Sequence, residues 1–158
     1  MAFSPDGERL ASGGGPPKKP WELKLFYATT GKELLTLKGH TASVHRVVYS
    51  PDSLRLASAS GEFGQPAEVK IWDATGGQEL LSLKGHTDMI KSMMFSPDGK
   101  LLATRSLDKS IRIWDAATGM ESFTLKGYSF ISMVFSSDSK GLMTASGNGL
   151  IRRWDVAP

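Results

Sequence analysis

The chain has 158 residues, 40% of them hydrophobic, and this length and content suggest one domain with enough apolar material for a core. It has no cysteine, which excludes disulfides and thiolate metal sites. Its 19 basic and 16 acidic residues are interspersed and give a net charge of +3, which favours an ordinary solvated surface and disfavours a nucleic-acid footprint.

A motif recurs along the chain with a period of about 40 residues. Trp-Asp pairs begin at Trp72, Trp114 and Trp154, and Gly-His pairs precede the first two of them at His40 and His86. A fixed period of this size indicates a repeat architecture and outranks any local interpretation. The repeats cover approximately residues 1–38, 39–84, 85–126 and 127–158.

The first repeat is predicted to begin inside a strand, because residues 1–3 and 47–49 both precede the same Ser-Pro-Asp sequence. Residues 4–7, Ser-Pro-Asp-Gly, fit a type I turn. Between the next two strands the stretch Gly13–Trp21 is rich in Gly and Pro and is expected to be an enlarged loop. The later strands of this repeat are predicted at Arg9–Ser12, Leu23–Tyr27 and Glu33–Leu37.

The second and third repeats are more regular, with apolar runs bounded by turn residues about every ten positions. Such runs fit strands whose sheets are covered on both faces, and the turn spacing favours strands over buried helix. The loop Gly61–Ala67 of the second repeat is again enlarged. The predicted strands are Val44–Ser50, Arg55–Ser58, Glu68–Trp72, Glu79–Leu83, Ile90–Phe95, Leu101–Thr104 and Ile111–Trp114.

The fourth repeat departs most from the pattern. Its turn lacks Pro and Gly, and Arg153 replaces an apolar residue. The chain reaches Pro158 shortly after Trp154-Asp155, so no outer strand is expected in this repeat. We therefore predict fifteen strands, the first of them cut short.

The Gly-His opening and Trp-Asp close at this spacing resemble the WD-repeat β-propeller family, and the resemblance covers essentially the whole chain. It implies an all-β fold, a β-propeller segment of about four blades, each a four-stranded antiparallel sheet. The first strand would be truncated and the last blade would lack its outer strand. Because a closed ring leaves no exposed sheet edge, we expect missing blades of a longer propeller, or another chain such as a second copy, to complete it.

In this family a His, a Ser or Thr, an Asp and the Trp form a hydrogen-bonded tetrad. The resemblance places this tetrad in the third repeat at His86, Thr104, Asp108 and Trp114. The composition is superficially that of a hydrolase triad, but the hydroxyl is committed to the indole and nothing suggests an oxyanion hole. We interpret the tetrad as structural and expect no enzyme.

Two other repeats carry partial tetrads. The second has His40, Ser58 and Trp72 but no matching Asp, and either Glu62 or Glu68 could take that place. The first repeat has no tetrad, so stability should centre on the third blade. The partial tetrad of the fourth repeat consists of Tyr128, Thr144, Asn148 and Trp154.

Several other kinds of chemistry are excluded by spacing. His45 has no second ligand at metal spacing, and the two Gly-Lys pairs, Gly31-Lys32 and Gly99-Lys100, lack the upstream Gly of a phosphate loop. We therefore expect no cofactor and no metal. The sequence also shows no membrane-length apolar run and no secretory signal, which is compatible with a cytoplasmic protein.

The enlarged loops of the first two repeats should be neighbours on one face of the propeller, and insertions on one face often mark a binding surface. They carry the aromatic residues Trp21 and Phe63, with Glu62 beside the latter. The alternative is that both rings cover their own blades. Arg105 belongs to the same candidate surface, because it stands near this face where the sister repeats have Ala.

These observations favour a non-catalytic scaffold that binds a protein partner through the loop face. A second hypothesis is an accessory propeller segment of a longer multidomain protein that carries an enzyme elsewhere. A nucleic-acid-binding module is the third, and the balanced charge disfavours it.

Overall fold

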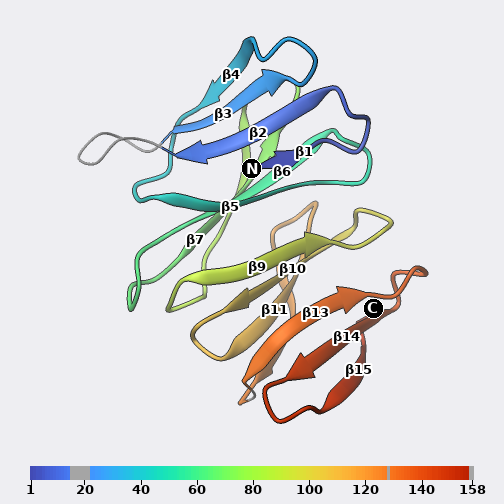
Figure 1. Ribbon diagram of the computed structural model, residues 1–158. Coiled ribbons are helices and arrows are strands. Elements are labelled where there is room, and N and C mark those ends of the chain that lie inside the picture. The colour runs from blue at the N-terminus through green and yellow to red at the C-terminus, as the bar shows by residue number, and fades with distance from the viewer. Residues whose placement is uncertain (15–21, 128, 157–158) are drawn as a thin grey trace.

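The chain folds into four antiparallel sheets that follow one another in chain order, as a computed structural model shows (Figure 1). The structure describes residues 1–14, 22–127 and 129–156. Within these residues there are fifteen strands and no helix. The predicted all-β propeller architecture is confirmed.

The first three sheets have four strands each, and the fourth has three. Within each sheet, consecutive strands pair antiparallel. The first sheet contains β1 (Ala2–Phe3), β2 (Arg9–Gly14), β3 (Glu22–Tyr27) and β4 (Glu33–Leu37). The second contains β5 (Val44–Tyr49), β6 (Arg55–Ser60), β7 (Glu68–Asp73) and β8 (Glu79–Leu83). The third contains β9 (Ile90–Phe95), β10 (Leu101–Ser106), β11 (Ser110–Asp115) and β12 (Glu121–Lys126). The fourth contains β13 (Phe130–Phe135), β14 (Gly141–Ser146) and β15 (Ile151–Asp155).

The strand boundaries follow the prediction closely. The strands β4, β8 and β9 begin and end at the predicted residues. The second strand of each of the first three sheets continues two residues beyond its predicted end, because its ladder with the third strand persists, as in the pair Arg105↔Ile111. The two-residue β1 and the three-stranded last sheet also agree with the prediction.

The turn between the first two strands of each sheet is fixed by a side chain. In the third sheet the Ser96 hydroxyl accepts from the Leu101 amide at 2.9 Å and donates to the Asp98 carboxylate at 2.6 Å. One residue of this turn adopts a positive φ, which is Gly99 here (φ 72°) and Ser139 in the fourth sheet (φ 61°). Glycine tolerates this backbone conformation at no steric cost, whereas serine pays for it in strain.

The core lies between consecutive sheets. We call the side of a sheet that points along the chain order its forward face and the opposite side its reverse face, and the two middle sheets are packed on both. Trp114 on the reverse face of the third sheet packs among Val69 and Ile71 on the forward face of the second. The same arrangement joins the first sheet to the second and the third to the fourth. Sheets covered on both faces explain why the strands read as apolar runs.

Candidate functional site

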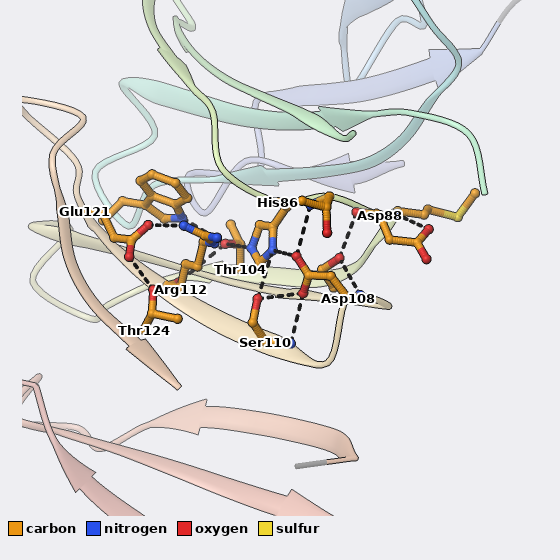
Figure 2. A network of polar contacts seen from close by, with 12 residues as sticks. His86, Asp88, Thr104, Asp108, Ser110, Arg112, Glu121 and Thr124 are labelled. Atoms are coloured by element: carbon orange, nitrogen blue, oxygen red, sulfur yellow. Dashed lines mark hydrogen bonds and ion pairs between the residues drawn. The ribbon is translucent and has the colours of Figure 1, made fainter. Parts of the chain in front are cut away.

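The four residues of the third-repeat tetrad come from separate elements, and Figure 2 shows three of them, His86, Thr104 and Asp108, side by side. His86 belongs to the connection between β8 and β9, Thr104 to β10, Asp108 to the turn after β10, and Trp114 to β11. The Trp114 indole Nε1 donates to the Thr104 hydroxyl at 2.8 Å, and that hydroxyl lies 2.8 Å from His86 Nε2. His86 Nδ1 lies 2.8 Å from the Asp108 carboxylate. The structure thus brings all four together.

The hydrogen bonds that link the four tetrad residues all run in one direction, from Trp114 to Asp108. The indole N–H can only donate, so Thr104 accepts from Trp114 and is free to donate its own proton to His86 Nε2. His86 then carries its proton on Nδ1 and donates it to Asp108. A single neutral tautomer of His86 satisfies every group.

Burial and hydrogen bonding set the protonation states of the tetrad. Desolvation lowers the pKa of His86, although Asp108 acts in the opposite direction. Desolvation tends to raise the pKa of Asp108, but hydrogen bonds from Ser110 and His86 outweigh it and leave that pKa below its ordinary value. The Ser110 hydroxyl donates to the Asp108 carboxylate at 2.6 Å, and the Thr87 amide donates to the same carboxylate at 3.1 Å. A neutral imidazole beside an ionised carboxylate is therefore the favoured state.

This geometry does not suit nucleophilic catalysis. The Thr104 side chain is fully buried, and His86 is buried as well. The hydroxyl has its indole donor on one side and its imidazole acceptor on the other, and a substrate has no path to it. The arrangement holds two strands, the turn between them and an inter-sheet connection together.

The second sheet completes its tetrad with Glu68. His40 Nδ1 lies 3.1 Å from the Glu68 carboxylate, and Nε2 lies 2.6 Å from the Ser58 hydroxyl, which accepts from the Trp72 indole at 2.7 Å. Ser60 adds a hydroxyl 2.7 Å from His40 Nδ1. Of the two acids that the sequence left open, the structure places Glu68 here.

Among the described residues, the fourth sheet forms only part of the hydrogen-bonded tetrad. The Trp154 indole donates to the Thr144 hydroxyl at 2.9 Å. Asn148 is exposed and accepts from the Leu150 amide of its own turn at 3.3 Å. Tyr128 lies outside the described residues. Asn148 therefore serves its turn rather than standing in for Asp108.

Cations stack on the tetrad tryptophans, a feature that the sequence reading missed. Lys70 binds Glu79 at 2.8 Å and lies 6.0 Å from the Trp72 ring. In the third sheet Arg112 pairs with Glu121 (Figure 2). Its guanidinium lies 6.0 Å from the centre of the Trp114 ring. The sequence contains a signal for these pairs, because a cation stands two residues before both Trp72 and Trp114, and a Glu stands seven residues after each of the two.

The loop Gly61–Ala67 lies on the face that carries the inter-sheet connection. The Gly64 amide donates to the Asp88 carboxylate at 2.8 Å, and the Ala67 amide donates to the His86 carbonyl at 3.3 Å. Phe63 at its tip is 78% exposed, so the ring does not cover its own sheet. Trp21, the aromatic residue of the other enlarged loop, lies outside the described residues.

The other two residues of the candidate surface differ in placement. Glu62 is exposed beside Phe63. Arg105 is half-buried between the third and fourth sheets, where its guanidinium donates to the Ser92 hydroxyl at 3.2 Å and to the Phe130 carbonyl at 2.8 Å. Burial and the charge of Arg46 lower the pKa of Arg105. Arg105 therefore joins two sheets, and the open surface lies with Glu62 and Phe63.

The described residues contain no group of three His, Asp or Glu that could hold a metal ion. In the same part of the chain no helix has the length and apolar character needed to cross a membrane.

The sequence profile of the WD domain, G-beta repeat, matches three consecutive segments, residues 31–73, 77–115 and 119–155. The chain belongs to the WD-repeat family. WD-repeat propellers generally serve as scaffolds for protein interactions and are generally non-catalytic, as the resemblance implied. No curated protein matches this WD-repeat chain.

Two designed proteins are among the solved structures that share the fold. The computationally designed Ika8 protein superposes with a TM-score of 0.78 at 24% identity, over 98% of this chain and 44% of Ika8. The computationally designed Ika4 protein gives a TM-score of 0.75 at 23% identity, over 95% of this chain and 86% of Ika4. This WD-repeat chain thus spans less than half of Ika8 and most of Ika4. At these identities the likeness concerns the fold alone.

Proposed function

We propose that this WD-repeat protein is a non-catalytic scaffold that binds a protein partner through the face carrying the Gly61–Ala67 loop. The observation that supports this most is the placement of Phe63. Its ring is 78% exposed, yet the loop that carries it is anchored to the next inter-sheet connection through Asp88 and His86. An aromatic side chain presented to solvent by an anchored loop is a typical interface feature.

The composition of the surface around Phe63 adds to this proposal. Glu62 lies exposed beside it and can form polar contacts at the rim of an interface. The buried tetrads keep the sheets below rigid, so a partner would meet a preorganised surface.

Site-specific photo-crosslinking tests the proposal. A photoreactive phenylalanine analogue at position 63 should form a covalent adduct with one protein of the source cells, identified by mass spectrometry. The matched control carries the same analogue at Met120, which is 70% exposed in the turn between β11 and β12 at the opposite edge of the sheets. Equal adducts from both positions, or an adduct with nucleic acid alone, would contradict the proposal.

A further inference from the structure

No described residue covers the apolar side chains on the forward face of the fourth sheet. Ile151 occupies the position of Val69 and Ile111, which are 1% and 0% exposed, yet Ile151 is 70% exposed. Val134, on the same face, is 54% exposed. Positions that are core between the earlier sheets therefore form an apolar surface here.

The reverse face of the first sheet is uncovered as well. Phe3 occupies the position of Tyr49, Phe95 and Phe135, each buried against the preceding sheet. Phe3 is 67% exposed. The two end faces are thus opposite halves of the same kind of interface, which the chain itself forms three times.

The interface between the second and third sheets shows what such a contact contains besides apolar packing. Arg55 reaches from the second sheet and donates to the Gly99 carbonyl at 2.7 Å and to the Ala116 carbonyl at 2.9 Å. Its guanidinium also lies 5.6 Å from the centre of the Phe95 ring. One arginine thus binds two carbonyls and an aromatic face of the next sheet.

In the fourth sheet Gly141 stands at the position that corresponds to Arg55 in the second sheet. The guanidinium of another residue, Arg153, lies beside Gly141. A Cβ atom added to Gly141 would come within 2.9 Å of Arg153 Nε. Arg153 belongs to β15, where the sister sheets have Ile71 and Ile113, and its side chain is 59% exposed beside Asp155. Arg153, which replaces an apolar residue of the repeat pattern, therefore occupies the space that an arginine at position 141 would fill.

The first sheet carries the counterparts of all three groups that Arg55 contacts. Phe3 corresponds to Phe95, and Gly7 to Gly99 with the same positive φ (75° and 72°). Ala28 corresponds to Ala116, since each amide donates at 2.8 Å to the residue that follows the turn glycine.

The turn residues supply a second line of support. The turn residue with a positive φ is glycine in the first and third sheets and serine in the second and fourth. In chain order these residues are Gly7, Ser53, Gly99 and Ser139. The serines Ser53 and Ser139 each accept from an Asp amide of the preceding sheet at 3.1 Å, whereas a glycine has no hydroxyl to do so. The arginine contact occurs beside either residue type, because Arg9 donates to the carbonyls of Ser53 and Ala74 at 3.4 and 3.0 Å. If the first sheet of a second copy followed the fourth, Ser139 would again be followed by Gly7, and the alternation would continue.

We infer that the forward face of the fourth sheet docks onto the reverse face of the first sheet of a second copy of this chain. Ile151 and Val134 then pack against the partner's Phe3, and Arg153 binds the carbonyls of the partner's Gly7 and Ala28. Two copies that do this reciprocally form a closed ring of eight sheets, within the size range of propellers.

Light scattering coupled to size-exclusion chromatography tests this on the chain as it stands. The expected mass at high concentration is twice the 17.1 kDa of one chain. Ile151→Glu and Phe3→Glu each alter an exposed side chain, so both variants should fold, with circular dichroism as the check, and both should run as monomers. Met120→Glu, a control that lies on neither end face, should remain dimeric.

Mixing the two variants sharpens the test. The Phe3→Glu copy keeps an intact forward face and the Ile151→Glu copy an intact reverse face, so their mixture should form a one-to-one complex. A wild-type chain that stays monomeric at every concentration, as expected if other sheets of a longer polypeptide cover these faces, would overturn the inference. A dimer that survives both substitutions would overturn it too.

Discussion

The indole of Trp114 donates to the hydroxyl of Thr104 at 2.8 Å, from a neighbouring strand of the same sheet. This bond leaves Thr104 with one proton, directed at His86, and so fixes the tautomer of a buried imidazole. A Thr-His-Asp set that resembles a catalytic triad in sequence is thereby committed to holding the third sheet to the connection that precedes it.

Removing the acid of this tetrad should destabilise the fold. Asp108→Ala leaves the Nδ1–H of His86 and the Ser110 hydroxyl without their acceptor, and we expect a loss of about 1–3 kcal/mol in the free energy of unfolding. Asn148→Ala, the equivalent change in the fourth sheet, removes one exposed turn contact and should cost less. Urea melts of both variants measure the difference, and equal, negligible losses would refute the structural role.

The second tetrad distinguishes two acids that the sequence could not separate. Glu68→Ala removes the carboxylate that binds His40 and Lys70, and should destabilise the fold by about 1 kcal/mol. Glu62→Ala, the matched control in the exposed loop, should leave the melting temperature unchanged. A larger loss from Glu62→Ala in thermal denaturation would show that this assignment is wrong.

Stability should fall as the solution is acidified below neutrality. Desolvation lowers the pKa of both His40 and His86 from the ordinary value of 6.5, so the unfolded chain binds these protons more readily. The stabilisation is complete above 6.5 and is lost progressively as the pH falls from that value through the lowered pKa of the folded state. Urea melts at about pH 7.5 and about pH 5.5 measure the change, which His86→Asn should reduce. A free energy of unfolding that is constant or rises on acidification contradicts this account.

Tyr49 offers a stabilising substitution. Its hydroxyl is buried with no hydrogen-bond partner among the described residues, and burial raises its pKa to about 12. The sister sheets carry Phe3, Phe95 and Phe135 at this position. Tyr49→Phe should therefore raise the free energy of unfolding by about 1 kcal/mol, because an unpaired buried hydroxyl is removed at little change in shape. A lower melting temperature in differential scanning calorimetry would reveal a partner for that hydroxyl.

The sequence predicted those features that depend only on the type of a residue and on its spacing in the repeat. Repeat period, turn residues and the Trp positions predicted the sheets and the third tetrad, because each strand must alternate with a turn at a fixed distance. The choice of Glu68 could not be predicted, since it depends on the direction in which a β7 side chain points. Arg105 could not be assigned either, because its acceptor is the Phe130 carbonyl, and any residue can supply a backbone carbonyl.

The affinity of Phe63→Ala for the protein that crosslinks at position 63 tests the central claim most directly. Isothermal titration should show binding at least about tenfold weaker than for the wild-type chain, with an unchanged melting temperature, because truncating an aromatic anchor at an interface typically costs this much. Met120→Ala should bind as the wild type does. Wild-type affinity in Phe63→Ala, together with a lowered melting temperature, would show that the ring is a packing residue and that the loop face is not the interaction surface.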